Sequence, residues 1–351
     1  RGLLRGLAQT AGDDELHLIC GREPPLDLSL PPSMTWHPTS FDPASRLRRI
    51  LFQQLRLSRT AKDLGAGAVH GPAYVTPLRN RLPAIASVYD LMVLIHPGLC
   101  ARANRIHYGL VLPRALPRCA RIIVPSNAVA DSVAALPGVA PDRIEIIPLG
   151  IDEEFHEPLA DGQVRAVRQR LGLPHRFLLF VGNQEPKKGL EVLVRALARL
   201  PLAPPLVIAG KRAWGMGGLD DLIRDSGLSE SIIFTGYLPD EDLPALYAAA
   251  EWLVFPSIYE GFGLPPLESM ACGTPVIASD GGALPETTGD ACVRVPAGRA
   301  GPLAEAIEAC WADAGKREGL IRKGRKQARR FSWRTHAQAV RKVYAEVRGG
   351  H

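Results

Sequence analysis

Two carboxylates and a glycine-rich turn lie close together within residues 257–279. Glu260 precedes the turn, and Glu268 follows after seven intervening residues, inside a predicted helix. Pro265 and Pro266 suit a first helical turn, where a missing N–H is tolerated. Free N–H groups at such a helix start can bind phosphate oxygens, and the carboxylates can accept hydrogen bonds from hydroxyls. This combination suits a sugar diphosphate; an ordinary strand–turn–helix with a capping glutamate is the alternative.

A basic loop follows an earlier apolar strand, predicted at residues 177–182. Lys187 and Lys188 end this loop, directly before a predicted helix at residues 190–200. Lys188 is well placed to neutralise a diphosphate bound at the end of the strand. A solvated surface lysine is the other interpretation of either residue.

The spacing of the two glutamates, in the setting Glu-Gly-Phe-Gly-Leu-Pro-Pro-Leu-Glu, resembles the Glu-x7-Glu signature of retaining GT-B glycosyltransferases. More narrowly, it is similar to glycosyltransferase family 4. Further segments also resemble this family, densely after Gly150 and more loosely before it, at residues 89–90, 125–127, 147–152, 177–190, 232–250, 281–286 and 330–333.

The resemblance implies which residues form a donor site. Glu260 would contact the donor sugar and Glu268 the nucleotide ribose, while Lys188 and Lys187 would stabilise the leaving diphosphate. Asn183 stands where many relatives carry an arginine, and lysine binds phosphate without the bidentate fork of arginine. The remaining implied donor contacts are Gly182, Tyr237, Leu238, Ser257, Gly261, Phe262, Gly263 and Leu264.

The acceptor side departs from the family pattern. Relatives often have His-Asp at the end of an apolar strand, whereas here Tyr89 precedes Asp90. Asp90 is the catalytic candidate on this side, with Tyr89 and His96 as acceptor-side candidates. His96 and His70 could each replace the usual histidine, or each could be an ordinary capping or core residue.

Strands alternate with helices along the chain, which predicts a parallel α/β sheet in each half. The resemblance implies a GT-B architecture of two Rossmann-like, doubly wound lobes facing an interlobe cleft. We expect an acceptor-side lobe at residues 1–155, a nucleotide-sugar-binding lobe at 156–332, and a final helix at 333–351 that packs back on the first lobe. Strands are predicted at residues 15–20, 66–70, 83–89, 121–125, 143–148, 177–182, 206–209, 232–235, 252–256, 275–279 and 292–295.

The first eight residues have apolar side chains at helical spacing, whereas a doubly wound domain normally begins with a strand. We therefore expect the printed sequence to be clipped at its N-terminus. The strand and the glycine-rich turn that relatives place before this helix would be missing, and that turn usually lies beside the donor phosphates.

Composition places limits on location and chemistry. The 351 residues suggest two domains, and 46% hydrophobic with 22% charged residues is typical of globular proteins. The six cysteines are dispersed, without zinc-type spacing, which favours buried thiols in a reducing compartment. The longest apolar stretch, residues 82–95, contains Asp90 and is shorter than the roughly 18 residues of a membrane span. We therefore expect a cytoplasmic protein without a metal.

A predicted basic helix at residues 46–62 carries six cationic side chains. Together with Arg102 and Arg105 it contributes much of the net charge of +6. Basic segments are attracted to anionic membranes by about 1 kcal/mol per residue, which favours peripheral contact with the inner leaflet or with a lipid diphosphate. A solvated helical face is the alternative. Nucleic acid is disfavoured, because no recognition motif accompanies the charge.

The resemblance implies a metal-independent, retaining glycosyltransferase of bacterial surface-polysaccharide synthesis. It would need no cofactor and would transfer a hexose from a nucleoside-diphosphate donor, with GDP-mannose favoured, to a glycan or lipid-linked glycan. Two alternatives stay open. One is a non-catalytic scaffold or partner protein of the same fold, and the other is a nucleotide-sugar epimerase.

Overall fold

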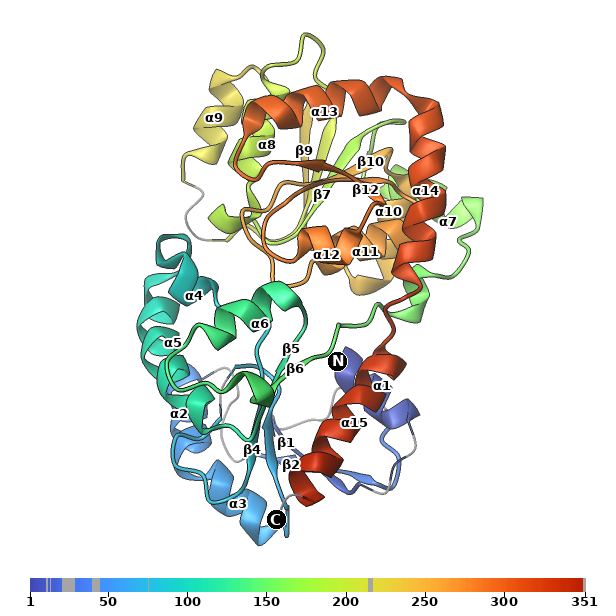
Figure 1. Ribbon diagram of the computed structural model, residues 1–351. Coiled ribbons are helices and arrows are strands. Elements are labelled where there is room, and N and C mark those ends of the chain that lie inside the picture. The colour runs from blue at the N-terminus through green and yellow to red at the C-terminus, as the bar shows by residue number, and fades with distance from the viewer. Residues whose placement is uncertain are drawn as a thin grey trace. The chain divides into compact units, whose positions relative to one another are not determined.

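The computed structural model describes residues 1–10, 12, 14–20, 29–39, 45–74, 76–213 and 217–349. The chain separates into two compact units (Figure 1). Unit 1 comprises Arg1–Gly150 together with Ser332–His351, and unit 2 comprises Ile151–Phe331. All strand pairs described in both units are parallel, which confirms the predicted α/β class.

Unit 1 contains two parallel sheets, one with the order β1-β2 and one with the order β3-β4-β5-β6. The strands are β1 (Leu16–Cys20), β2 (Met34–Pro38), β3 (Val69–Gly71), β4 (Ala84–Ser87), β5 (Arg121–Val124) and β6 (Ile144–Ile146). The helices are α1 (Gly2–Gln9), α2 (Arg46–Leu55), α3 (Leu57–Asp63), α4 (Met92–Ile95), α5 (Arg102–Ala115), α6 (Asn127–Ala134) and α15 (Trp333–Gly349).

The predicted single basic helix at residues 46–62 is wrong, because the structure has two helices there. Arg56, with φ of −117°, separates α2 from α3. The break lets α3 bury Ala61 while Leu47, Leu51 and Leu55 of α2 stay exposed. A continuous helix would follow one axis and could not present both faces in this way.

The last helix, α15, completes the core of unit 1. Val340 and Val343 pack against Ile85, Ile123 and Ile147 of the four-stranded sheet region. Leu7 of α1 forms a second cluster with Ala337 and Met34. Residues from the two ends of the sequence therefore pack together in these hydrophobic clusters.

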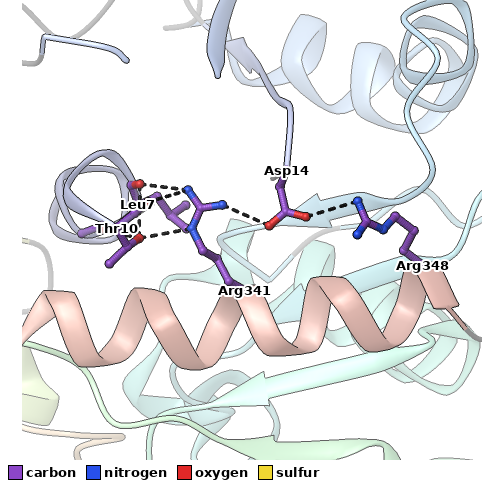
Figure 2. Close-up of polar contacts among 6 residues, drawn as sticks. Leu7, Thr10, Asp14, Arg341 and Arg348 are labelled. Carbon is purple, nitrogen blue, oxygen red and sulfur yellow. Dashed lines mark hydrogen bonds and ion pairs between the residues drawn. The ribbon is translucent and has the colours of Figure 1, made fainter. Parts of the chain in front are cut away.

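A buried arginine of α15, Arg341, forms hydrogen bonds to the end of α1, and Figure 2 shows its contacts. Nη2 of Arg341 donates to the carbonyl oxygens of Leu7 and Thr10, both at 3.0 Å. These are carbonyls at the carboxyl end of α1, which have no partner within a helix. Nη1 of Arg341 also binds Oδ2 of Asp14 at 3.0 Å, and Arg348 lies 3.7 Å from the other carboxylate oxygen.

Unit 2 contains one parallel sheet with the order β12-β11-β10-β7-β8-β9. Its central strands are entirely buried, as expected for a sheet with helices on both faces. The strands are β7 (Leu178–Val181), β8 (Leu206–Ala209), β9 (Ile232–Gly236), β10 (Trp252–Phe255), β11 (Val276–Ser279) and β12 (Cys292–Val295). The helices are α7 (Asp161–Arg170), α8 (Leu190–Leu197), α9 (Leu219–Asp225), α10 (Leu243–Ala249), α11 (Leu264–Ala271), α12 (Leu284–Thr288), α13 (Ala300–Ala312) and α14 (Ala314–Ala328).

The strand order of unit 2 reverses between β7 and β10. Strands β7, β8 and β9 follow one another toward one edge of the sheet. Strands β10, β11 and β12 follow one another toward the opposite edge. Ligands of open α/β sheets bind outside the carboxyl ends of the strands at such a switch point. Within the described ranges, no helix is both long enough and apolar enough to cross a bilayer.

Candidate functional site

The switch point of unit 2 brings a lysine and a carboxylate together. Lys188 ends the 3-10 helix η5 (Pro186–Lys188) after β7, and Glu260 follows β10. Nζ of Lys188 donates to Oε1 of Glu260 at 2.7 Å. The side chains are 16% and 11% exposed, so the pair is partly shielded but reachable from solvent. Two candidates that lie 72 positions apart in the sequence are therefore direct neighbours.

Oε1 of Glu260 is fixed by a second donor as well. Oγ of Ser257, also a predicted donor-site residue, donates to Oε1 at 2.7 Å. Nζ of Lys188 also lies 5.3 Å from the centre of the Phe255 ring. Among the described side chains, both hydrogen bonds to Glu260 go to Oε1, which leaves Oε2 able to accept from a ligand hydroxyl.

The backbone of Glu260 is held by the segment after β11. The N–H of Ala283 donates to the carbonyl oxygen of Glu260 at 2.8 Å, and Glu260 forms a parallel bridge with Gly282. Gly282 has φ of +64°, and a Cβ there would collide with that same carbonyl oxygen. Glycine is therefore required for the close approach that positions the carboxylate.

The turn between Glu260 and α11 offers backbone N–H groups. Gly263 has φ of +96° directly before the helix, and a Cβ there would lie 2.6 Å from Cδ2 of Leu284. Pro265 and Pro266 in the first helical turn carry no N–H. The N–H groups at the helix start therefore belong to Gly263 and Leu264, and these two could donate to an anion there.

Phe262 and Leu238 differ from the other candidates because their side chains point inward. Phe262 is buried and packs edge-to-face on Phe331, with ring centres 5.5 Å apart. Leu238 is buried too. Only the backbones of these two residues can meet a ligand.

Glu268 is a half-buried residue of α11. The hydroxyl of Tyr247, a fully buried residue of α10, donates to Oε2 of Glu268 at 2.9 Å. Burial raises the pKa of Glu268 to about 7; the charges of Asp152 and Asp240 act in the same direction, and the bond from Tyr247 opposes them. Tyr247 was not among the predicted residues, and its one sequence signal is that it is the single aromatic residue of the helix.

The remaining donor-side candidates surround the lysine loop. A Cβ at Gly182 would lie 3.9 Å from Cε of Lys188, so Gly182 borders the lysine. The carbonyl oxygen of Lys187 accepts from the N–H of Ile258 at 2.7 Å and joins the two loops of the site. Tyr237 is 60% exposed, and Nζ of Lys211 lies 4.5 Å from its ring centre.

The acceptor-side candidates belong to unit 1, and two of them, Asp90 and Tyr89, bind neighbouring backbone. Oδ1 of Asp90 accepts from the N–H of Met92 at 3.0 Å, at the start of α4. The hydroxyl of Tyr89 donates to the carbonyl oxygen of Pro72 at 2.8 Å. His96 is exposed at the end of α4.

His70, the alternative to His96, is half-buried in unit 1. Nδ1 contacts the Tyr344 hydroxyl at 2.7 Å and Nε2 contacts Oγ of Ser87 at 2.8 Å. Burial lowers the pKa of His70 to about 4, with the charge of His336 acting in the same direction. Both imidazole nitrogens of His70 are therefore engaged within unit 1.

An Asp-x-Asp sequence occurs at Asp240–Asp242, in the 3-10 helix η6. Oδ1 of Asp242 is bound by Nη2 of Arg170 at 2.7 Å. In the part of the chain that the structure describes, no three His, Cys, Asp or Glu side chains are grouped as metal ligands.

Comparison with known proteins shows the family of the chain. The family described as Glycosyltransferase Family 4 matches residues 1–155, and the family described as Glycosyl transferases group 1 matches residues 165–327. An O-antigen chain mannosyltransferase B from Escherichia coli is 32% identical over 269 residues, covering 75% of this chain and 70% of that protein. The chain belongs to glycosyltransferase family 4.

Other relatives of this family 4 glycosyltransferase match over less of their length. The D-inositol 3-phosphate glycosyltransferase of Mycobacterium bovis is 34% identical over 245 residues, covering 65% of this chain and 49% of that protein. The chain therefore spans about half the length of that relative.

Solved structures resemble the family 4 glycosyltransferase as a whole. The alignment with a sucrose-phosphate synthase from Thermosynechococcus elongatus covers 100% of this chain and 93% of the synthase chain, with a TM-score of 0.81 and 24% identity. The glycosyltransferase WaaG of lipopolysaccharide biosynthesis covers 97% of this chain and 94% of its own, with a TM-score of 0.74 and 16% identity. At these identities the likeness shows the fold alone, and it confirms the predicted GT-B architecture.

Proposed function

We propose that this family 4 glycosyltransferase is a retaining, metal-independent hexosyltransferase. Its donor is a nucleoside-diphosphate sugar, with GDP-mannose favoured, and its acceptor is a glycan or lipid-linked glycan of bacterial surface-polysaccharide synthesis. The observation that carries the proposal is the contact of Lys188 with Glu260 at the switch point of unit 2. The 32% identity to an O-antigen mannosyltransferase supports mannose as the sugar.

In the proposed reaction, the bond between the anomeric carbon and the diphosphate oxygen breaks. Lys188, with Lys187 and the N–H groups of Gly263 and Leu264, stabilises the growing negative charge of the leaving group. These donors are already fixed in the site, so little reorganisation is needed. They supply the positive field that a metal ion would otherwise provide.

Glu260 orients the sugar and does not attack it. Held by Lys188 and Ser257 through Oε1, it accepts from a sugar hydroxyl through Oε2. The leaving phosphate oxygen takes the proton of the acceptor hydroxyl, and that hydroxyl attacks the anomeric carbon from the same face. Front-face attack retains the anomeric configuration. Glu268 binds the ribose of the donor during this step.

We also propose that the enzyme acts on the cytoplasmic side and contacts an anionic membrane through α2. Leu47, Leu51 and Leu55 are spaced by four residues and are 67%, 48% and 74% exposed. Exposed Arg48 and Arg49 lie on the same helix. A helix with exposed leucines and cationic side chains suits the boundary between lipid headgroups and acyl chains.

The acceptor contacts are proposed to come from unit 1. Asp90, Tyr89 and His96 follow β4 at its carboxyl end, where ligands of parallel sheets bind. Tyr89 and Asp90 each also stabilise a neighbouring loop, so their replacement would affect both the acceptor and the local backbone.

Donor screening tests the proposal. The protein is incubated with GDP-mannose, UDP-glucose or ADP-glucose and a glycan acceptor, and the product linkage is identified by NMR. Transfer of mannose with an α-linkage from the α-linked donor is the expected result. Binding without transfer or hydrolysis would favour the scaffold alternative, and release of an epimeric sugar nucleotide would favour the epimerase.

A further inference from the structure

A pocket of about 630 Å³ lies in unit 2 at the carboxyl end of α11. Ala271, Cys272 and Gly273 line it there, and α7 and α14, which Figure 1 shows beside each other, supply other walls. Its described lining includes none of the donor-site candidates, and Gly263 and Leu264 are about 12 Å away at the other end of α11. Small-molecule sites are typically pockets of about 300–1,000 Å³, so this pocket has the size of a ligand site.

One face of α14 lines this pocket with three arginines. The four lining residues of this face are spaced by four along the helix and its C-cap: Arg317, Ile321, Arg325 and Arg329. Residues four positions apart are neighbours on a helix surface, so the like charges of Arg325 and Arg329 destabilise α14. α7 adds Arg165 to the same lining. A pattern that works against the stability of its own helix is expected where side chains serve a ligand.

Most of these arginines have no acceptor within the protein. Nε of Arg317 donates to the carbonyl oxygen of Glu251 at 3.3 Å. Within the part of the chain that the structure describes, the side chains of Arg165, Arg325 and Arg329 have no hydrogen bond or ion pair. Their N–H groups are therefore able to donate to a ligand in the pocket.

The pocket carries net positive charge. Two exposed carboxylates also line it, Glu157 and Asp161, and among the described residues neither forms an ion pair with a lining arginine. His156, a further lining residue, adds no charge at neutral pH. Burial lowers the pKa of His156, and the charge of Arg329 acts in the same direction, against that of Glu153. Four guanidinium groups against two carboxylates suit an anionic ligand.

The carboxyl end of α11 favours the position of Arg325. Gly273 has φ of +83°, and a Cβ there would lie 2.5 Å from Nη2 of Arg325, so the guanidinium group lies directly against the backbone. The carboxyl end of a helix carries partial negative charge, which attracts a guanidinium group. Arg325 is therefore partly preorganised, which reduces the entropy that ligand binding must overcome.

The chemistry of the lining defines a class of ligand. Guanidinium groups bind phosphate through pairs of parallel N–H donors. Three of them match the three terminal oxygens of a phosphate monoester, which carries a charge of about −1.5 to −2 at neutral pH. A phosphate group alone fills only part of the pocket, and apolar side chains are available to the rest of the molecule: Pro158, Leu159, Val164 and Ala248.

We propose that this pocket binds a phosphate monoester, at a site separate from the proposed donor site. Arg165, Arg325 and Arg329 bind the phosphate oxygens, and the apolar lining residues contact the organic part. A soluble molecule is favoured over a lipid headgroup, because none of the large apolar side chains exposed among the described residues lines the pocket.

Isothermal titration calorimetry on the 351-residue chain tests the proposal. Glucose 6-phosphate is the soluble probe, and glucose, which should not bind, is its uncharged control. Arg325→Gln/Arg329→Gln should weaken binding of glucose 6-phosphate by about tenfold or more, because two charge-assisted donors are lost. The matched control, Arg322→Gln/Lys326→Gln, removes the same charge from exposed positions of α14 that do not line the pocket, and it should bind like the parent protein.

Vesicles that contain phosphatidic acid, a phosphate monoester of a lipid, distinguish the source of the phosphate. Binding of either probe that is lost in Arg325→Gln/Arg329→Gln supports the site. The probe that binds identifies the ligand as soluble or as a lipid headgroup, and we expect glucose 6-phosphate to be that probe.

Two further measurements make the outcome decisive. Lys188→Ala should keep the affinity for the probe, because Lys188 belongs to the proposed donor site. Histidine NMR at constant ionic strength should show that the bound probe raises the pKa of His156, because the anion offsets the charge of Arg329. The proposal would be overturned if neither probe binds, if both double variants lose affinity equally, if Lys188→Ala alone loses it, or if the pKa of His156 does not change.

Discussion

At the scale of single residues, Lys188 has a role that a charge deletion can test. Lys188→Ala should reduce kcat by about 10²- to 10³-fold, since the loss of one preorganised donor to a developing negative charge has that effect. Lys323→Ala is the matched control, because that exposed lysine contacts Asp290 outside the site. Circular dichroism should show an intact fold in both variants. Near-normal turnover of Lys188→Ala would refute the role.

The raised pKa of Glu268 predicts that the free energy of unfolding depends on pH. Its pKa in the folded protein is raised from 4.5 to about 7, so the folded state holds a proton that the unfolded state has released. Stability therefore falls as pH rises from about 4.5 to 7, and the loss persists above 7. Glu268→Gln should remove this effect and should stabilise the protein by about 2 kcal/mol more at pH 8 than at pH 5. Urea unfolding at both pH values measures the difference.

The same substitution also tests the proposed ribose contact. The glutamine side chain of Glu268→Gln keeps an oxygen that can accept from Tyr247 but loses the charge, so nucleotide affinity should fall while kcat at saturating donor changes little. The loss should be greater at about pH 8, where the parent carboxylate is ionised, than at about pH 6. A fall in kcat with unchanged donor affinity would contradict the ribose assignment.

The proposed metal independence can be tested through the donors placed around the leaving group. Lys188 and the N–H groups of Gly263 and Leu264 are the proposed positive field, and Asp242 is bound to Arg170. Activity should therefore persist in excess EDTA. Complete loss, restored by manganese but not by dilution of the chelator alone, would show that a metal ion supplies part of that field.

At the scale of elements, α2 is the membrane-contact candidate. Replacing Arg48, Arg49 and Arg56 by glutamine should weaken binding to vesicles that contain anionic lipid, and added salt should weaken binding of the parent protein. Donor affinity should stay unchanged, because the proposed donor site lies in unit 2. The control variant replaces Arg322, Lys326 and Arg330, which removes the same charge from exposed positions of unit 2. Equal loss in both variants, or no salt dependence, would favour a solvated helical face.

At the scale of the whole molecule, the two units should respond differently to the donor. Proteins with two units need not unfold in one transition. GDP at about 100 times its Kd should stabilise unit 2 by about 2.7 kcal/mol and raise the temperature of its transition. Calorimetry with and without GDP measures this shift. If a separate transition of unit 1 moves equally, the donor does not act through unit 2 alone.

Much of the fold could be predicted because its signals are local. The apolar runs that form β7 and β10 have few polar residues, and their alternation with helical segments indicates parallel sheets. β2 was missed because its five residues, Met34–Pro38, follow two prolines and lack an apolar run. The family resemblance assigned Lys188 and Glu260 to one donor site but did not predict their hydrogen bond. The bond of Tyr247 to Glu268 depends on packing between α10 and α11 and leaves no local pattern.

The return of α15 to unit 1 has a consequence for biosynthesis. Unit 2 is one uninterrupted stretch, whereas unit 1 needs α15, whose Arg341 closes the end of α1. A ribosome releases residues in order, at about 5–20 per second, and domains usually fold in the same order. Here unit 2 can finish folding first, while the earlier residues of unit 1 wait for α15 to emerge. During that interval they expose the apolar side chains that α15 later covers.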